Sequence, residues 1–287
     1  MNKLTDTYKL SNGVEIPWVG YGTWQTPDGD TAINAVCAAI ECGYRHVDGA
    51  AVYGNEASVG EGIRQGMASA GIGREQLFVT SKVWTSERGY DKTIRACEKS
   101  LKDFGLDYFD LYLIHWPANA VSSGDRWDEV NQESWRAMID LYKTGKARAI
   151  GLSNFLPHHI ESLMKMEVVP MVDQIENHPG YVQEEAIRYC KQNSILVEAW
   201  SPMGSGVVLK DPQMGALAKK YGRSVAQMCI RWNLQMGVVP LPKSVTPSRI
   251  LENTKVFDFE ISKEDMATID AIKNVGFSGN NPDTFNV

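Results

Sequence analysis

The sequence predicts an α/β protein whose strands close into a (β/α)8 barrel. Short apolar or β-branched runs alternate along the chain with longer stretches of helical spacing, which is the pattern of right-handed βαβ units around a parallel sheet. Eight such runs span about 260 residues, roughly 30 per repeat, and this matches a barrel better than the two halves of a doubly wound sheet. Periodicity alone leaves the doubly wound sheet open as an alternative.

The predicted strands are short and are bounded by turn or helix signals. In order along the chain they are Trp18–Thr23, Arg45–Asp48, Leu77–Lys82, Phe109–His115, Ala147–Leu152, Met171–Ile175, Leu196–Trp200 and Val238–Leu241. Before the first of them, Tyr8–Leu10 and Val14–Ile16 flank an Asn-Gly pair, which indicates a β-hairpin. We expect this hairpin to cap the bottom of the barrel, at its N-terminal mouth.

The predicted helices between these strands carry their apolar residues on one face. In Glu56–Ser69, for example, Val59, Ile63 and Met67 recur at helical spacing with charged residues between them. The others are Thr31–Glu41, Lys92–Phe104, Gln132–Lys143, Glu184–Gln192 and Val225–Met236. The polar, glycine-containing segments Pro117–Asp128 and Asn274–Val287 are expected to be long surface loops. Because no linker or composition break interrupts the pattern, residues 1–287 are expected to form one domain.

Composition excludes several classes of partner. Lys and Arg number 29 against 35 Asp and Glu, a formal net charge of −6, and no basic run occurs, which argues against nucleic acid as a partner. No apolar stretch approaches the about 20 residues of a membrane-spanning helix, and the first ten residues lack the apolar core of a signal peptide. Five scattered cysteines with no C-x-x-C pair favour buried thiols in a reducing compartment. We therefore expect a cytoplasmic monomer.

Several common functional motifs are incomplete. Gly20-Tyr21-Gly22 lacks the third glycine of the dinucleotide fingerprint, and neither a P-loop nor an H-E-x-x-H motif occurs. The segment Gly151-Leu152-Ser153-Asn154-Phe155 departs from the nucleophile elbow of hydrolases at its last position. These segments therefore indicate none of those functions.

Ionisable residues stand where consecutive predicted strands end. Asp48 ends the second strand and Tyr53 lies in its loop, while Lys82 ends the third strand and His115 the fourth. The carboxyl ends of barrel strands carry the active site, and a lysine at the end of an apolar strand needs an anion, which Asp48 supplies. Each residue alone is more simply interpreted as structural, but together they favour a catalytic site.

The chemistry that these four residues support is the protonation of an oxyanion formed from a carbonyl group. A free tyrosine titrates at about pH 10, so it is a poor proton donor at neutral pH. An adjacent ammonium favours the phenolate and lowers the tyrosine pKa toward a range useful for proton donation. The aspartate keeps the lysine charged, and the histidine can polarise and orient a carbonyl oxygen. No serine or cysteine nucleophile stands beside the histidine, and no cluster has metal-ligand spacing, so no metal site is predicted.

The residues around this cluster resemble a known family. The segment from Gly43 to Glu56, GYRHVDGAAVYGNE, is similar to the first signature of the aldo-keto reductases, and Lys82 and His115 stand in segments similar to its other active-site motifs. The resemblance extends from the hairpin to Asn253. It implies a (β/α)8 barrel, NADPH-dependent reduction of aldehydes or ketones, and a catalytic tetrad of Asp48, Tyr53, Lys82 and His115 with Tyr53 as the general acid. His46 and His178 match none of this chemistry and are interpreted as structural.

The resemblance also implies the cofactor contacts. Ser153, Asn154 and Gln174 would bind the nicotinamide carboxamide, and Trp200 would stack on the ring. Tyrosine stands there in many animal members, and tryptophan resembles a bacterial subgroup that includes diketogluconate and small-aldehyde reductases. Lys243, Ser244 and Arg249 suit the 2′-phosphate of NADPH. The full set of expected cofactor residues is Gly22, Thr23, Asp48, Ser153, Asn154, Gln174, Trp200, Ser201, Pro202, Met203, Gly204, Ser205, Lys243, Ser244, Val245, Arg249, Glu252 and Asn253.

Aromatic residues at strand ends predict an apolar substrate pocket. Its expected residues are Trp24, Tyr53, Trp84, His115 and Trp116. Compared with the animal aldose and steroid reductases, the chain has shorter loops and a shorter C-terminal tail, which indicates an open, permissive pocket for a small aldehyde or ketone. The alternative is a barrel that binds NADPH in a regulatory or structural role with incidental turnover. An isomerase or hydrolase is disfavoured because no base and nucleophile pair occurs.

Overall fold

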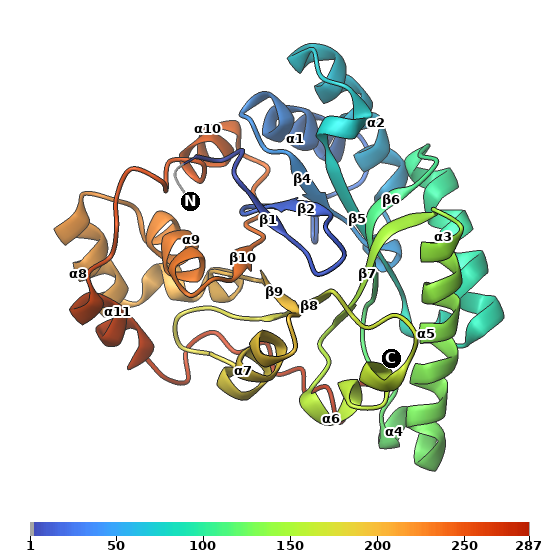
Figure 1. The fold of residues 1–287 in the computed structure, drawn as a ribbon. Helices are drawn as coiled ribbons and strands as arrows, with labels where there is room; N and C mark the ends of the chain where they lie inside the picture. The colour runs from blue at the N-terminus through green and yellow to red at the C-terminus, as the bar shows by residue number, and fades with distance from the viewer. Residues whose placement is uncertain (1–2, 287) are drawn as a thin grey trace.

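The computed structural model describes residues 3–286, and at its centre lies an eight-stranded parallel sheet (Figure 1). The strands follow one another in the order β10-β9-β8-β7-β6-β5-β4-β3. The backbone N–H groups of Gly20 and Gly22 donate to the carbonyls of Pro240 and Pro242, each at 3.1 Å, and so join the first strand to the last. The predicted (β/α)8 barrel is therefore confirmed, and the doubly wound alternative is wrong.

The strands lie close to the predicted runs. Their bounds are β3 (Tyr21–Gly22), β4 (His46–Asp48), β5 (Phe78–Val83), β6 (Phe109–Ile114), β7 (Ala147–Ser153), β8 (Val172–Glu176), β9 (Leu196–Trp200) and β10 (Val239–Pro240). Nearly all of their side chains are buried, because one face of each strand fills the barrel and the other meets a helix.

Helices surround the sheet as an outer layer (Figure 1). The longer ones are α1 (Asp30–Glu41), α2 (Glu56–Ala70), α3 (Tyr90–Phe104), α5 (Trp127–Lys143), α7 (Glu184–Gln192), α8 (Pro212–Tyr221), α9 (Val225–Gln235) and α11 (Lys263–Asp270), with shorter turns at α4 (Ala120–Ser123), α6 (Pro157–Ile160) and α10 (Pro247–Glu252). Glycines let α2 approach both neighbouring helices closely, since a Cβ at Gly60 would lie 2.2 Å from the carbonyl oxygen of Phe104 and one at Gly62 2.7 Å from that of Ile33. None of the helices within residues 3–286 is long and apolar enough to cross a membrane.

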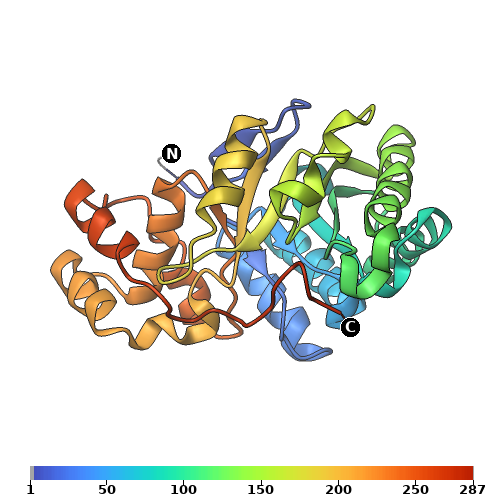
Figure 2. The same ribbon diagram turned by 90° about the horizontal axis from the view of Figure 1, so that it is seen from below.

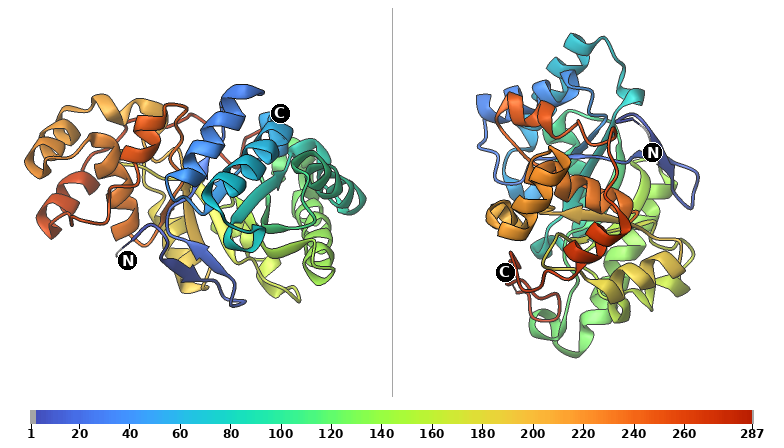
Figure 3. Two further views of the ribbon diagram at one scale, coloured as in Figure 1. Left: turned by 90° about the horizontal axis from the view of Figure 1, so that it is seen from above. Right: turned by 90° about the vertical axis from the view of Figure 1, so that its left-hand side faces the viewer.

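The N-terminal hairpin covers one end of the barrel. Its strands β1 (Thr7–Lys9) and β2 (Glu15–Pro17) pair antiparallel. Together with Arg45, Phe78 and Arg148, which lie at the N-terminal ends of three barrel strands, the hairpin lines a shallow surface depression. The hairpin and the C-terminal segment lie at opposite ends of the barrel (Figure 3). The predicted cap is confirmed, and the other end is left to the loops that follow the strands.

The two segments expected to be surface loops are more ordered than the sequence indicates. Within Pro117–Asp128, the Asn119 side chain accepts from the backbone N–H of Ser122 and begins α4, and α5 begins at Trp127. The C-terminal segment runs from α11 across the end of the barrel (Figure 2), where the Asn119 amide donates to the carbonyls of Pro282 and Phe285, both at 2.8 Å. The expectation of a surface loop is therefore wrong for Pro117–Asp128, which contains α4 and the start of α5, and it is confirmed for the described part of Asn274–Val287, which forms neither helix nor strand.

Candidate active site

Three of the predicted catalytic residues meet at the ammonium group of Lys82. Its Nζ donates to Oδ2 of Asp48 at 2.8 Å, to the carbonyl of Gly49 at 2.9 Å and to the hydroxyl of Tyr53 at 3.2 Å. These contacts use all three N–H bonds of the ammonium. The Lys82 side chain is fully buried and that of Asp48 almost so, so the pair is shielded from solvent.

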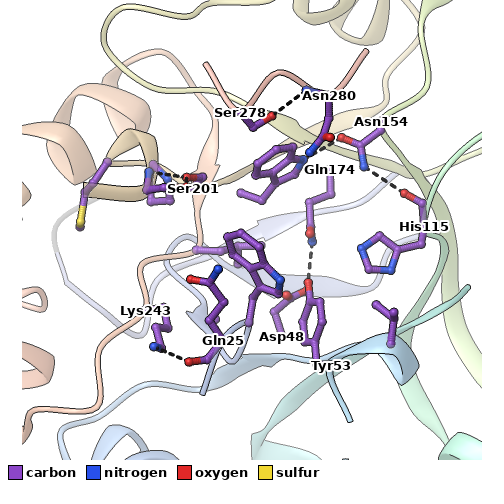
Figure 4. A pocket seen from close by; sticks show the side chains of 18 of the residues that line it. Gln25, Asp48, Tyr53, His115, Asn154, Gln174, Ser201, Lys243, Ser278 and Asn280 are labelled. Atoms are coloured by element: carbon purple, nitrogen blue, oxygen red, sulfur yellow. Dashed lines mark hydrogen bonds between the residues drawn. The ribbon is translucent and has the colours of Figure 1, made fainter. Parts of the chain in front are cut away.

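The strand ends determine this meeting. Asp48 is the last residue of β4, and its register partner on the parallel strand β5 is Thr80, two residues before Lys82. After β4 the chain makes a single 3-10 turn at Ala51–Tyr53, which ends at Gly54 with φ of 68° and places the Tyr53 ring beside Lys82. Figure 4 shows the Tyr53 side chain between Asp48 and His115 at the wall of the pocket.

The pKa values of the cluster reflect burial set against charge. Burial lowers the pKa of Lys82, but Asp48 and Tyr53 together outweigh it and the net direction is upward, so the ammonium stays charged. For Tyr53, burial raises the pKa, Lys82 opposes the rise, Asp48 adds to it, and the net direction is also upward. The expectation of a tyrosine pKa below its usual value is therefore wrong for this structure. Tyr53 is a neutral phenol at neutral pH and can donate its proton.

His115, the fourth of the predicted catalytic residues, lies beside Tyr53. Its ring meets the ring of Tyr53 edge to face at a centroid distance of 5.8 Å and that of Trp84 at 5.0 Å. Burial and, to a lesser extent, the charge of Lys82 lower the pKa of His115 well below its usual value. The imidazole is therefore neutral and carries a single N–H that can donate to a bound oxygen.

A cavity of about 500 Å³ opens above the four residues. The residues expected in the substrate pocket all line it, namely Trp24, Tyr53, Trp84, His115 and Trp116, and Trp200 lines it as well. Phe285 lines it as well, stacks on Trp116 at a centroid distance of 3.9 Å and meets Trp84 edge to face at 6.1 Å. The C-terminal segment therefore narrows the pocket that the sequence indicates to be open.

Two amide side chains face the same cavity in fixed orientations. The Asn154 amide nitrogen donates to the carbonyl of His115 and to the Ser153 hydroxyl, and its oxygen accepts from the indole N–H of Trp200 at 2.8 Å. The Gln174 amide nitrogen donates to Asp48 and to Glu198. Because both NH₂ groups are fully used, both amides offer oxygen lone pairs to a ligand in the cavity (Figure 4).

The predicted cofactor residues separate into two groups. Those that line the cavity are Gly22, Asp48, Asn154, Gln174, Trp200, Ser201, Pro202, Met203, Ser205 and Lys243. Those that lie outside its lining are Thr23, Ser153, Gly204, Ser244, Val245, Arg249, Glu252 and Asn253. Of these, Thr23 and Ser153 are buried behind the wall, where their hydroxyls donate to the carbonyls of Asp48 and Gln174. Arg249 is exposed on α10.

Some lining residues carry no signal in the sequence. Gln25 accepts from Lys243 at 2.9 Å through its backbone carbonyl, and Ser278, Asn280 and Phe285 come from the C-terminal segment. That segment is also held by Asp283, which contacts Nε2 of both His158 and His159 at 2.8 and 3.3 Å. The backbone N–H of Leu156 donates to Nδ1 of His159, which leaves the ring proton of His159 on Nε2, facing Asp283. The two histidines therefore hold the C-terminal segment through the Asp283 carboxylate. Only the fold brings these distant residues together.

Comparison with known proteins shows what the chain is similar to. The model of the aldo/keto reductase family matches residues 18–274. The chain is 50% identical to an uncharacterized oxidoreductase of Bacillus subtilis, over 96% of this chain and 96% of the relative. It is 49% identical to a glyoxal reductase of the same organism, over 98% of this chain and 97% of the relative.

A solved structure supports the same assignment. The aldo-keto reductase of Bombyx mori, crystallised in complex with NADP, is 35% identical and superposes with a TM-score of 0.85, covering 96% of this chain and 94% of its own. The barrel, the four residues at its strand ends and these similarities agree with one another. The chain belongs to the aldo/keto reductase family of oxidoreductases.

Proposed function

We propose that the protein reduces small aldehydes and ketones to alcohols, with NADPH as the hydride donor and Tyr53 as the proton donor. The observation that carries this proposal is the Tyr53 hydroxyl, which lies 3.2 Å from the buried ammonium of Lys82 at the wall of an aromatic-lined cavity. Such a hydroxyl can release its proton to a developing alkoxide while the ammonium stabilises the phenolate that remains.

The residues of the cavity fit a nicotinamide cofactor. Trp200 offers a flat ring, and the oxygens of Asn154 and Gln174 suit the two N–H bonds of a carboxamide. The segment from Ser201 to Gly206 supplies backbone at the cavity wall, and Lys243 adds a cation. When bound there, NADPH supplies the hydride that the carbonyl carbon accepts.

His115 positions the substrate in this proposal. Because its imidazole is neutral, it donates one hydrogen bond to the carbonyl oxygen without competing with Tyr53 as an acid. The carbonyl oxygen then receives the proton of Tyr53, and the Tyr53 phenolate is reprotonated from solvent before the next turnover. Asp48 keeps Lys82 charged and in place throughout.

The similarity to a glyoxal reductase and the shape of the pocket support small carbonyl substrates. Trp84, Trp116 and Phe285 pack against one another on one side of the cavity, which leaves limited width next to His115. We propose that aldehydes and dicarbonyls of a few carbon atoms are accepted and that bulky ring systems are disfavoured.

Turnover of a carbonyl panel tests the reaction. With NADPH and methylglyoxal, glyoxal, a nitrobenzaldehyde or a steroid ketone, we expect loss of nicotinamide absorbance for the small substrates and alcohol as the product. Binding of NADPH without turnover of any of them would contradict the proposal and would indicate a cofactor-binding protein instead. A strong preference for the steroid would contradict the proposed pocket.

Replacing Arg249 tests the proposal that this residue contacts the 2′-phosphate of NADPH. The Arg249→Gln variant should bind NADPH about 10- to 100-fold more weakly, since a hydrogen bond to a charged group is worth about 1.5–3 kcal/mol. Its affinity for NADH should change little, because NADH lacks the 2′-phosphate. Arg95→Gln, which removes an exposed cation from α3, is the matched control. Equal losses for the two cofactors would contradict the role of Arg249; tryptophan fluorescence measures both affinities.

The proposal also covers the cellular compartment and the oligomeric state of the protein. Cys97, Cys190 and Cys229 are buried, Cys37 and Cys42 are partly buried, and all five are free thiols, which supports a reducing compartment such as the cytoplasm. We propose that residues 1–287 act as a single domain, built around one eight-stranded barrel, and as a monomer.

A further inference from the structure

A second carboxyl group lies directly below the catalytic cluster, inside the barrel. Glu198 stands on β9 in register with Gln174 on β8, and its side chain is fully buried. The Gln174 amide nitrogen donates to Oε2 of Glu198 at 2.9 Å and to Oδ1 of Asp48 at 3.0 Å. One NH₂ group therefore connects Glu198 to the catalytic Asp48.

The remaining surroundings of Glu198 offer it no cation in contact. From β4, Nε2 of His46 lies 3.8 Å from Oε1, but this nitrogen is 3.1 Å from the Thr80 hydroxyl of β5. Lys82 on β5 donates its three hydrogen bonds to Asp48, Gly49 and Tyr53. On β10, the register partner of Glu198 is the apolar Val239. Within residues 3–286, Oε1 of Glu198 has no hydrogen-bond partner.

This arrangement determines the charge of Glu198. The Lys82 ammonium is the cation shared by the carboxyl groups of Asp48 and Glu198, and it donates a hydrogen bond to Asp48. Burial raises the pKa of Glu198 to about 8, and Asp48 adds to the rise, while Gln174 and Lys82 oppose it. Burial and Lys82 lower the pKa of His46 to about 3, so His46 stays neutral and cannot balance a second carboxylate. Glu198 is therefore a neutral acid at neutral pH.

We propose that Glu198 is a positioning residue for carbonyl reduction: its neutral carboxyl group orients Gln174 and leaves the charge of Lys82 to Asp48 and Tyr53, and its ionisation weakens proton delivery by Tyr53. The inference rests on the proposed function, because it concerns the step in which Tyr53 donates. It assigns a role to a buried group that does not itself touch the cavity.

The physical reason is the sum of charges below Tyr53. With Glu198 neutral, Asp48 and Lys82 compensate each other, and the phenolate formed during the reaction gains from the nearby ammonium. When Glu198 ionises, a second negative charge shares that ammonium through the low-dielectric interior, and the phenolate becomes harder to form. The turnover number should then fall as pH rises through the pKa of Glu198, before Tyr53 itself titrates.

The Glu198→Gln variant tests this, because it keeps an oxygen that accepts from Gln174 and cannot ionise. We expect kcat of the wild-type protein to fall between about pH 7 and about pH 9. The quantity compared is the ratio of kcat at about pH 9 to kcat at about pH 7. This ratio should be up to about tenfold higher in E198Q than in the wild-type protein, because roughly nine tenths of an acid is ionised one pH unit above its pKa. Saturating NADPH and substrate are used at each pH.

Asp173 provides a matched control on the neighbouring position of β8. It is fully buried, and burial raises its pKa to about 8 against the opposing hydrogen bonds from Phe155 and Cys190, yet its side chain faces Cys190 of α7 rather than Gln174. Asp173→Asn should therefore leave the ratio as in the wild-type protein. Both variants should gain stability relative to wild type as pH rises from about 5 to about 8, since each removes an acid whose folded pKa lies above its unfolded value.

The outcomes separate the possibilities. If E198Q keeps the wild-type ratio, or if Asp173→Asn changes it equally, the positioning role is refuted; an unchanged pH dependence of E198Q stability would refute the neutral acid. Should E198Q fail to fold, Glu198→Met removes the same charge with an apolar side chain and carries the same expected ratio. Wild-type protein that turns over no carbonyl would contradict the proposed function instead.

Discussion

Replacing Tyr53 by Phe should lower kcat for carbonyl reduction by roughly 100- to 10,000-fold, the usual contribution of a positioned general acid. The change removes the hydroxyl that lies 3.2 Å from Nζ of Lys82 and leaves the ring, which meets that of His115 edge to face. NADPH affinity should change little, because the proposed cofactor contacts are made by Trp200, Asn154 and Gln174. The prediction is therefore a loss in the chemical step alone.

Single-turnover kinetics check this prediction. Enzyme preloaded with NADPH is mixed with excess methylglyoxal, and the loss of nicotinamide absorbance gives the rate of hydride transfer, while quenching of tryptophan fluorescence gives the cofactor affinity. Tyr112→Phe is the matched control, because Tyr112 is fully buried on β6 and its hydroxyl has no hydrogen-bond partner in the part of the chain that the structure describes. A Tyr53→Phe rate within a few fold of wild type would refute Tyr53 as the acid.

The fold was predictable from the sequence where local pattern and tertiary environment agree. β9 has the predicted bounds, since its apolar residues Leu196, Val197 and Ala199 are buried. The first strand is shorter than predicted, because Trp18 leaves the sheet and packs on Tyr8 of the hairpin at a centroid distance of 5.3 Å. The six-residue helix α10 buries only Ile250, and so short an amphipathic pattern gives no periodic signal.

The cluster around Lys82 was predictable for a different reason. Asp48, Lys82 and His115 each lie within one residue of the end of consecutive strands β4, β5 and β6, and a barrel brings the ends of consecutive strands together even when their register is not known. Contacts that depend on register or on a distant segment were not predictable. The Gln174 bridge to Glu198 needs the alignment of β8 with β9, and Phe285 reaches Trp116 only because the C-terminal segment crosses the barrel end.

Removing the buried ammonium has the second large expected effect. In Lys82→Met, the Asp48 carboxylate would keep the Gln174 amide as a donor but lose its cation, and breaking a buried pair in this way costs about 3–5 kcal/mol of unfolding free energy. Turnover should also fall steeply, because nothing then stabilises the Tyr53 phenolate. Chemical denaturation followed by far-UV circular dichroism measures the stability.

The pH dependence of that loss has a definite sign. In the wild-type protein the pKa of Lys82 lies above its usual value, so its stabilising effect is complete below about pH 10.4 and is lost only as pH rises further. In Lys82→Met this stabilising effect is absent, so the loss of stability relative to wild type should become smaller as pH rises above about 10.4.

A double variant separates charge balance from catalysis. Asp48→Asn added to Lys82→Met removes the unpaired carboxylate, so part of the lost stability should return. Activity should not return, because proton delivery by Tyr53 needs the ammonium itself and not merely a neutral interior. Recovery of turnover together with stability would show that Lys82 serves only to balance Asp48, and the electrostatic role assigned to it in proton donation would then be wrong.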